Sequence, residues 1–258
     1  MPLSPSVLLA AALETLWPAA CAACDRPIPD AALFCALCYQ SVSPLFGACA
    51  GCALPMLDPD DAAQPGTRCR TCRRVPLPFA AATAGFEYGE ALARGLVRMK
   101  HGGRRHLARR LARLLVRPLA EALARGGFTR ADAIVAVPLH EARLRTRGFN
   151  QALELARWAL DGLARTPALA PRGGLPALER HLLRRVRPTR ALGHAGPAAR
   201  FTEVAGAFLC EDPARLRGRR VLLVDDVYTT GATFGACADA LLRAGAREVH
   251  ALALARAV

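Results

Sequence analysis

The sequence predicts an α/β protein with an open parallel sheet, preceded by a separate cysteine-rich module. From about residue 77 onward, apolar runs typical of buried strands alternate with segments of helical spacing. Eight of the ten cysteines lie between Cys21 and Cys72. The charge changes at the same place, since residues 1–75 hold 5 basic and 6 acidic side chains and residues 76–258 hold 30 and 15. We therefore expect two modules, over residues 1–76 and 77–258.

The composition excludes two classes of protein. Apolar residues make up 53% of the 258 residues, enough for a core, so an intrinsically disordered chain is not expected. No run of about 18 apolar residues occurs, so no membrane insertion is expected. The apolar N-terminal stretch has no basic residue before Val7–Leu13 and is interrupted by Glu14. This pattern favours a short amphipathic helix over a signal peptide, and hence a cytoplasmic protein.

Four C-x-x-C pairs determine the chemistry of the N-terminal module. The tight turn of such a pair presents two thiolates to one metal ion at about 2.3 Å, and two pairs complete a tetrahedron. The pattern predicts two structural Zn²⁺ ions with no coordination position open for catalysis. The expected ligands are Cys21, Cys24, Cys35, Cys38, Cys49, Cys52, Cys69 and Cys72.

The spacing leaves the pairing of these cysteines open. The simplest arrangement is sequential, with the first two pairs on one ion and the last two on the other. A cross-braced arrangement uses the same residues. A disulfide framework requires an oxidising compartment, and a thioredoxin-like role requires one C-x-x-C rather than four in series. Because the module is too small to fold by apolar burial alone, metal binding would supply on the order of 10 kcal/mol per site.

The first half of the larger module alternates strands and helices. Phe79–Tyr88 has the composition of a strand and is followed by Gly89. Glu90–Lys100 and Arg105–Arg125 show helical spacing of their leucines. Ala133–Pro138 is a short apolar run typical of a buried parallel strand, and Phe149–Leu163 is helical again.

The second half begins with a Pro-, Gly- and Ala-rich stretch over residues 164–178, which we expect to be a linker or irregular loop. Arg219–Val224 predicts a buried strand, Thr233–Ala244 a helix closed by Gly245, and Glu248–Ala255 a final strand. Ligands of an open parallel sheet bind beyond the C-terminal ends of its strands. The residues after Val224 are therefore the first place to look for a site.

The nine residues that follow Val224 carry groups suited to a ribose phosphate. Two adjacent carboxylates can hold ribose hydroxyls or the Mg²⁺ that accompanies a polyphosphate. Threonine hydroxyls and the amides around a glycine form an anion nest, and the next helix adds its N-terminal dipole. The alternative is a strand–turn–helix connection with ordinary capping. The candidate catalytic residues are Asp225 and Asp226, and the candidate phosphate-binding residues are Thr229, Thr230, Gly231, Ala232 and Thr233.

This stretch resembles the phosphoribosyl-pyrophosphate (PRPP) loop of the type I phosphoribosyltransferases. Val135–His140 and Arg143–Gln151 resemble the signature of the ComF family, as do Tyr88 with Met99–Lys100 and the N-terminal cysteine pattern, which in that family is a double zinc ribbon. The resemblance covers nearly the whole chain. It implies a type I phosphoribosyltransferase-like parallel sheet, and some members are associated with DNA uptake in natural competence.

The resemblance also implies roles for individual residues. Asp225 and Asp226 would contact the ribose hydroxyls of PRPP, and Thr229–Thr233 would cradle its 5′-phosphate. The turn at Pro138–His140 would hold pyrophosphate, with Arg143 and Arg147 as its partners. Bidentate Arg–phosphate geometry suits this role, although a solvated basic face is the alternative for both arginines. Asn150 and Gln151 would cap and pack the next helix.

One segment departs from the family pattern. The resemblance implies a mobile segment over Arg184–Phe208, in which Arg187, Thr189 and Arg200 fit. Leu192 stands where a glutamine is usual, and Glu203 where an asparagine is usual.

Two functions follow from these patterns. The first is binding of PRPP or a related ribose phosphate with Mg²⁺, and transfer of the phosphoribosyl group to an acceptor that the sequence does not identify, with release of pyrophosphate. The second is a non-catalytic accessory that binds single-stranded DNA or competence proteins. Residues 94–117 hold nine basic and no acidic side chains, and residues 180–200 hold six more. Such stripes bind phosphate backbones without sequence preference, but aromatic residues for base stacking form only 5% of the chain.

Overall fold

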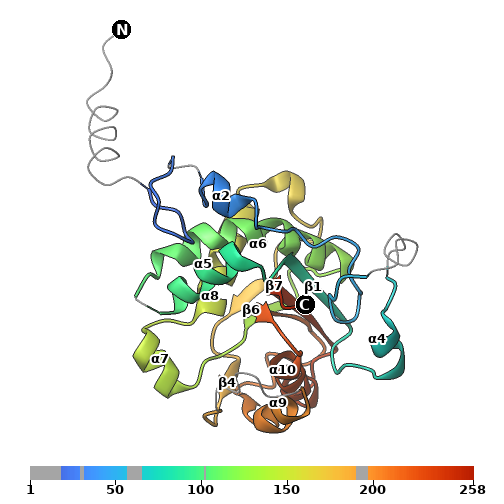
Figure 1. The fold of residues 1–258 in the computed structure, drawn as a ribbon. Helices are drawn as coiled ribbons and strands as arrows, with labels where there is room; N and C mark the ends of the chain where they lie inside the picture. Colours follow the sequence, from blue (N-terminus) through green and yellow to red (C-terminus); the bar gives the residue numbers. More distant parts are fainter. Residues whose placement is uncertain (1–18, 30–31, 57–65, 102, 190–196) are drawn as a thin grey trace.

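The computed structural model describes residues 19–29, 32–56, 66–101, 103–189 and 197–258 (Figure 1). The short helix expected before Cys21 lies outside these residues. Among the helices that the structure describes, none is both long and apolar enough to cross a membrane.

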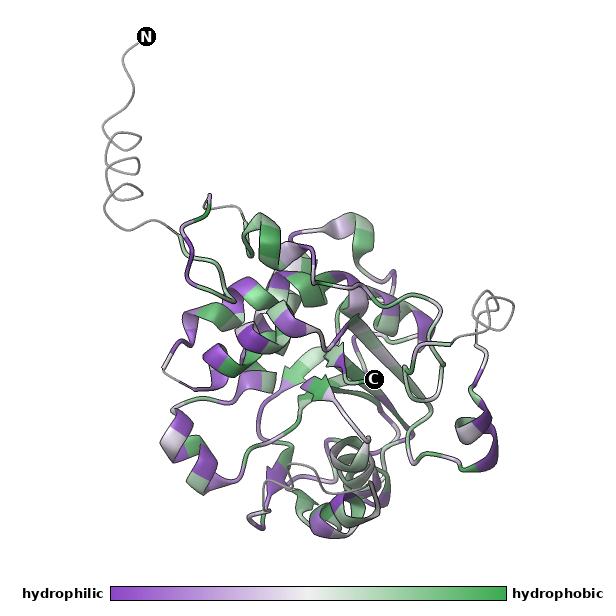
Figure 2. Ribbon diagram, viewed as in Figure 1, coloured by the Kyte–Doolittle hydropathy of each residue, from purple (hydrophilic) through white to green (hydrophobic). Residues whose placement is uncertain are grey.

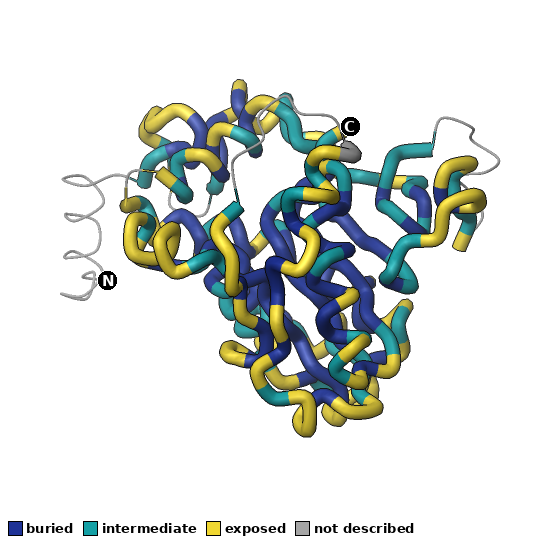
Figure 3. The backbone as a smooth tube through the Cα atoms, turned by 90° about the horizontal axis from the view of Figure 1, so that it is seen from below, coloured by how far each residue is buried: buried dark blue, intermediate teal, exposed yellow. Residues whose placement is uncertain are grey.

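A five-stranded parallel sheet forms the centre of the larger module, as predicted. The strands are β1 (Ala81–Glu87), β2 (Ala133–Ala136), β3 (Ala177–Glu179), β6 (Arg220–Tyr228) and β7 (Glu248–Arg256). Their order in the sheet is β1-β7-β6-β2-β3, and all four pairings are parallel. The central strands β2, β6 and β7 are almost wholly buried, whereas the edge strands β1 and β3 are buried only in part. Figure 3 shows the buried core at the centre of the molecule.

Helices cover both faces of this sheet because buried apolar side chains alternate toward both sides of its strands. Figure 2 shows hydrophobic residues gathered in the central strands. One face packs against α5 (Glu90–Lys100), α6 (His106–Arg125) and α8 (Gln151–Ala164). The other packs against α10 (Ala232–Arg243). Figure 1 shows the two groups of helices on opposite sides of β6 and β7.

Several short elements are present that the sequence did not predict. An antiparallel pair joins β4 (Leu183–Arg185) to β5 (Phe208–Cys210). Residues 164–178 contain a 3-10 turn, η1 (Pro167–Leu169), and the first residues of β3. Strands of three residues are too short to show a hydrophobic period, which explains why they were missed. The remaining additions are α7 (Glu141–Arg147) and α9 (Pro197–Val204).

The cysteine module packs along the edge of the sheet and against α5 and α6. Backbone pairing joins it to β1, with Leu45 N–H donating to the Gly85 carbonyl at 2.9 Å and Glu87 N–H donating to the Ser43 carbonyl at 2.9 Å. This pairing covers the outer edge of β1, which would otherwise expose unpaired backbone groups. Among its described residues, the module contains the short helices α2 (Ala36–Tyr39) and α4 (Arg70–Arg74).

Candidate functional site

A cleft of about 760 Å³ opens at the C-terminal ends of β2 and β6, where an open parallel sheet binds its ligands. The sequence-predicted residues of the PRPP-loop stretch and of the Arg143–Gln151 stretch meet there, although they come from distant parts of the chain. The charged side chains that line the cleft are Lys100, Arg143, Arg147, Arg185, Arg200, Glu203, Asp225 and Asp226.

Strand β6 continues four residues beyond its predicted end at Val224, so Asp225 and Asp226 lie within the strand. Pairing with β7 extends as far as Tyr228 opposite Arg256, and it holds these residues in extended backbone. Successive side chains of a strand point to opposite faces of the sheet. The two carboxylates therefore enter the cleft from opposite sides rather than as a side-by-side pair.

Asp226 is bound from the α5 and α8 side. Its Oδ2 forms an ion pair with Lys100, and its Oδ1 accepts a hydrogen bond from Gln151 Nε2 at 3.3 Å. Burial alone would raise the pKa of Asp226, but the ammonium of Lys100 and the hydrogen bonds of the carboxylate, that from Gln151 included, together leave the pKa lowered. Conversely, burial would lower the pKa of Lys100, and the Asp226 carboxylate raises it. Asp226 is therefore held as a carboxylate by a cation from another element.

Asp225 lies in the opposite electrostatic situation. Its Oδ1 accepts the backbone N–H of Asp226 at 2.8 Å, and no cation lies within ion-pair distance of it among the described residues. Burial, and then the neighbouring negative charge of Asp226, raise the pKa of Asp225 well above its usual range. The negative charge of Asp226 is therefore stabilised by its surroundings, whereas that of Asp225 is not.

The loop after β6 carries a run of backbone amides at the start of α10. Within the described residues, the backbone N–H groups of Thr229, Thr230 and Gly231 donate no hydrogen bond. Gly231 has φ +84°, a left-handed conformation that glycine adopts without strain, and it caps the N-terminus of α10. Free amides at a helix N-terminus form an anion-binding site.

The predicted arginines Arg143 and Arg147 lie on α7, at the rim of the cleft. Arg147 donates to Gln151 Oε1 at 2.5 Å, and Arg143 donates to the Thr189 carbonyl at 3.1 Å. Asn150 caps α8 through its side chain, as expected, with Oδ1 accepting the N–H of Ala152 at 2.9 Å. Gln151 does more than pack, because it connects Arg147 to Asp226.

Arg185 lines the cleft but was not predicted from the sequence. It is only 8% exposed, its guanidinium lies 5.2 Å from the ring centre of Phe208, and it donates to the hydroxyl of Thr189. Burial, followed by the positive charge of Arg143, lowers its pKa. No carboxylate of the described residues forms an ion pair with it. A buried cation without a counter-ion is costly, and a bound anion would offset that cost.

The segment that departs from the family pattern contributes to this cleft. Arg200 of α9 donates to the Thr229 hydroxyl at 3.3 Å, and Arg187 donates to the carbonyl of Glu203 at 2.7 Å. Glu203 lines the cleft, whereas Leu192 lies outside the described residues.

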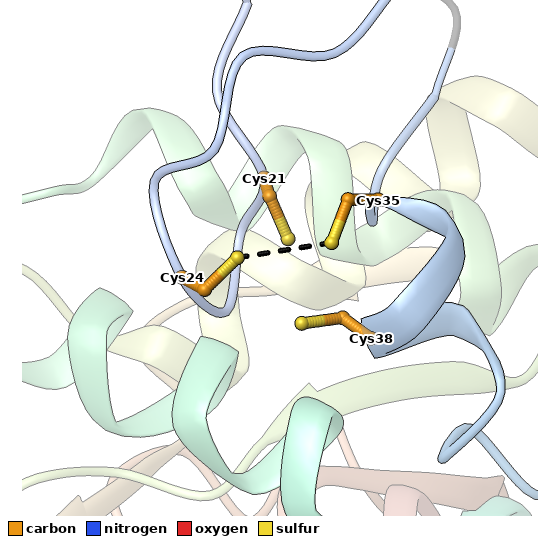
Figure 4. A group of neighbouring side chains, drawn as sticks. All are labelled: Cys21, Cys24, Cys35 and Cys38. Carbon is orange, nitrogen blue, oxygen red and sulfur yellow. Dashed lines mark hydrogen bonds between the residues drawn. The ribbon is translucent and has the colours of Figure 1, made fainter.

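The eight cysteines form two groups of four, paired sequentially. In each group the sulfur atoms all lie within 4.8 Å of one another. Cys24 and Cys35 sulfurs are 3.8 Å apart, as are those of Cys52 and Cys69 (Figure 4 shows the first group). A tetrahedron with metal–sulfur bonds of about 2.3 Å has edges of about 3.8 Å. All ten cysteines are free, and these groups fit a double zinc ribbon.

Many basic residues of the stripe over residues 94–117 form contacts with other groups of the chain, although the side chains of Arg105 and Arg117 stay 58% and 79% exposed. Arg98 and Arg104 form ion pairs with Asp25, and Arg110 donates to the carbonyl of Ala20 at 2.6 Å. These contacts fasten the first cysteine group to α5 and α6. Arg105 pairs with Glu154, and Lys100 with Asp226.

Comparison with known proteins agrees with this architecture. Residues 188–257 match the family model described as a phosphoribosyl transferase domain. The DNA utilization protein YhgH of Salmonella typhimurium is 31% identical over 86% of this chain and 89% of its own length. The protein of the same name from Escherichia coli K12 is 29% identical with the same coverage. Competence protein F of Haemophilus influenzae is 32% identical over 66% of this chain and 70% of its own.

Among solved structures, TT1426 from Thermus thermophilus is similar over 55% of this chain and 72% of its own, with 22% identity and a TM-score of 0.29. A score this low does not support a comparison of the two folds.

Proposed function

The chain belongs to the ComF family, and from this premise we propose that its cleft binds PRPP, or a related ribose 5-phosphate, together with Mg²⁺. The observation that carries the proposal is that one cleft contains several arginines, two buried carboxylates, and the loop residues Thr229 and Thr230, whose amides donate no hydrogen bond within the described residues. Each group matches one part of the ligand.

The 5′-phosphate is assigned to the loop Thr229–Thr233. The amides of Thr229, Thr230 and Gly231 supply donors, and the N-terminus of α10 adds a positive dipole end. Arg200, which already contacts the Thr229 hydroxyl, lies beside the same loop.

The pyrophosphate is assigned to the arginines on the other side of the cleft. Arg143 and Arg147 present their guanidinium groups from α7, and Arg185 is buried behind them without a counter-ion among the described residues. Arginine suits a phosphate because its planar fork donates two parallel hydrogen bonds.

The ribose hydroxyls and Mg²⁺ are assigned to Asp225 and Asp226. The chemistry of the donors fits this ion, because Mg²⁺ prefers carboxylate oxygens and phosphate oxygens. The Oδ2 of Asp226 accepts no hydrogen bond and is compensated only by the ion pair with Lys100 within the described part of the chain. When bound, Mg²⁺ would neutralise charge on the phosphate groups.

The reaction that we propose for bound PRPP is displacement at the anomeric carbon. A nucleophile forms a bond to C1 of the ribose while the bond from C1 to the pyrophosphate oxygen breaks, and pyrophosphate leaves with the electron pair. The arginines of this chain would stabilise the charge that develops on that oxygen. A screen of nucleobases and amines for pyrophosphate release identifies the acceptor.

Calorimetric titration tests the proposal. PRPP with Mg²⁺ is titrated into the wild type, into Asp225→Asn/Asp226→Asn, and into Asp239→Asn, which removes an exposed carboxylate from α10. Binding to the wild type and to Asp239→Asn, with loss of affinity in the double variant, supports the site. No heat with the wild type, or equal affinity in all three proteins, refutes it.

The names of the relatives support a second candidate, a role in handling DNA. The engaged arginines of the 94–117 stripe count against a broad DNA surface there, because those side chains hold the cysteine module in place. Titration of single-stranded DNA at increasing salt distinguishes the two candidates. Binding at low salt that weakens steeply with salt supports DNA contact, and absence of binding at low salt removes it.

We also propose that Zn²⁺ is the metal of both cysteine groups. Four thiolates in a tetrahedral arrangement favour Zn²⁺ over Mg²⁺ or Ca²⁺, which prefer oxygen ligands. The thiolate is the form of cysteine that binds a metal ion, so metal binding at these groups would release the thiol protons.

A further inference from the structure

Arg256, near the end of the chain, connects the second cysteine group to the candidate phosphate loop. Its Nε donates to the carbonyl of Cys52 at 3.0 Å, and Cys52 is a member of that group. Its Nη1 donates to the carbonyls of Tyr228 at 3.1 Å and Thr229 at 2.5 Å. One side chain therefore bridges two modules that are far apart in sequence.

The surroundings of Arg256 fix the position of its guanidinium group. The residue is 8% exposed, and its guanidinium lies 4.4 Å from the ring centre of Tyr228. Its polar partners are backbone carbonyls, with that of Ala257 as the fourth. Within the described residues, no carboxylate forms an ion pair with it. A buried guanidinium satisfied only by carbonyls depends on those carbonyls staying in place.

These bonds determine which way the loop amides point. In a trans peptide the C=O and the following N–H point in opposite directions, and the described residues contain no cis peptide. Because Arg256 binds the carbonyls of Tyr228 and Thr229, the N–H groups of Thr229 and Thr230 point away from it. These are two of the three amides that donate no hydrogen bond within the described residues, and both residues line the cleft.

The ring of Tyr228 packs directly against the loop that contains Gly231. It is 1% exposed and packs against Phe79 and Phe234, with ring centres 6.3 and 5.3 Å away. A Cβ placed on Gly231 would lie 2.7 Å from the Tyr228 hydroxyl, so the loop rests directly on this ring. Arg256 lies over the ring and completes the support.

The position of the Cys52 carbonyl depends in turn on the cysteine group. Ala53, the next residue, has φ +53°, an unfavourable conformation for a residue with a Cβ. Two features of the surrounding structure keep Ala53 in this backbone conformation. Its N–H donates to the Cys49 carbonyl at 2.8 Å, and the four cysteine sulfur atoms of the group lie within 4.8 Å of one another. Loss of metal would release this turn, because the ligands of a structural site are ordered by the ion.

We propose that Arg256 is a positioning residue through which the metal-bound second cysteine group orders the phosphate loop, so that loss of metal from that group weakens anion binding in the cleft. The first cysteine group has no such contact among the described residues, since it packs against α5 and α6. The inference rests on the proposed function only for the identity of the ligand.

The test uses the full, metal-loaded chain and ribose 5-phosphate as the probe. Arg256→Met and Arg256→Lys are compared with Arg247→Met, which removes an exposed arginine next to the opposite end of β7. Calorimetry gives the dissociation constant, and amide hydrogen exchange without ligand gives the protection of the peptides around Thr229–Gly231. We expect at least about a tenfold weaker affinity and faster exchange in both Arg256 variants, because hydrogen bonds from a charged donor are lost.

Cysteine variants test whether the second cysteine group acts on the phosphate loop through Arg256. Cys69→Ser disrupts the second group and Cys24→Ser disrupts the first, as a matched control. Cys69→Ser should weaken binding and accelerate exchange in the loop, and should add nothing in an Arg256→Met background. Cys24→Ser should leave both quantities unchanged.

Three results would overturn the proposal. Wild-type affinity in Arg256→Lys would show that charge, rather than positioning, is what Arg256 contributes. Equal effects of Cys24→Ser and Cys69→Ser would show a general loss of stability. Unchanged loop exchange in Arg256→Met would show that the residue does not order the loop. If wild type binds no ribose 5-phosphate, the proposed function fails, and the exchange data still decide the coupling.

Discussion

Lys100 forms an ion pair with Asp226 in the lining of the cleft, although the two residues lie on α5 and β6 and far apart in the sequence. Lys100 is the only lysine among 35 basic residues. The Asp226 side chain is 5% exposed, so the pair is largely shielded from water. The pair compensates a carboxylate at the place where we assign Mg²⁺ and the ribose hydroxyls.

The first prediction concerns this pair. Lys100→Met should destabilise the protein by about 3 kcal/mol at neutral pH, because removing one partner leaves a buried charge uncompensated. We take the low end of the usual range because the Lys100 side chain is 21% exposed. Lys100→Met/Asp226→Asn should recover part of the loss. Urea unfolding measures all three free energies, and a double variant as unstable as Lys100→Met would contradict the prediction.

The second prediction concerns pH. The pKa of Asp226 is lowered, so its contribution to stability is present above the ordinary aspartate pKa and is lost as pH falls through the folded-state value. The pKa of Asp225 is raised, so that group has the opposite sign and costs stability at neutral pH. Asp225→Asn should therefore be more stable than wild type at neutral pH, and Asp226→Asn less stable.

The measurement is the pH dependence of the difference in unfolding free energy between each variant and the wild type. Unfolding free energies from about pH 3 to about pH 7 should show the advantage of Asp225→Asn shrinking as the pH falls. The loss of unfolding free energy in Asp226→Asn relative to the wild type should shrink only near the lowest pH of the series, about pH 3. Parallel curves for wild type and both variants would rule out these assignments.

The third prediction separates binding from stability at Arg185. Arg185→Met should raise the unfolding free energy by about 1 kcal/mol without ligand, because it replaces a buried charge that has no counter-ion in the described structure. The same variant should bind pyrophosphate at least about tenfold more weakly, since a charge-assisted contact is lost. Thermal unfolding with and without pyrophosphate measures both effects.

The matched control for Arg185 is its neighbour. Arg184→Met removes an arginine that is 51% exposed and pairs with Glu211. It should change stability by less than about 1 kcal/mol, as exposed ion pairs usually do, and should leave pyrophosphate binding unchanged. A loss of stability in Arg185→Met, or equal affinities in the two variants, would show that Arg185 is not an anion-binding residue.

The fourth prediction concerns metal content. Native mass spectrometry should find two Zn²⁺ per chain in the wild type and one in Cys24→Ser, because each group contains its own four ligands. A strong chelator should lower the unfolding temperature, since structural metal binding contributes folding free energy. A folded protein without metal, or loss of both ions in Cys24→Ser, would refute independent zinc sites.

Much of the fold followed from local sequence patterns. The helix over Glu90–Lys100 was predicted to its end residues, because an amphipathic stripe of this length has one stable way to bury its apolar face. The strands over Arg219–Val224 and Glu248–Ala255 were recognised by their buried apolar runs. The eight cysteines were assigned to two metal sites from spacing alone.

The sequence could not supply contacts between distant segments. Lys100 and Arg185 reach the cleft from α5 and from the β4–β5 pair, which are distant from β6 in the sequence. Lys100 belongs to a stretch that resembles the family signature, but its ion pair with Asp226 was not predicted. No local pattern distinguishes Arg185 from other basic residues. The extension of β6 to Tyr228 depended on its pairing with β7, so the opposite orientation of Asp225 and Asp226 was not foreseen.

The N-terminal module shows the same division. Residue spacing predicted two four-cysteine groups able to hold a metal ion, because a tight turn fixes the separation of two thiolates. Sequential pairing, the use of Arg98, Arg104 and Arg110 to fasten the module, and the bridge from Cys52 through Arg256 to the loop were decided only in three dimensions. Metal binding by a C-x-x-C pair can be predicted from neighbouring residues, whereas compensation of a buried charge depends on which distant segments the fold brings together.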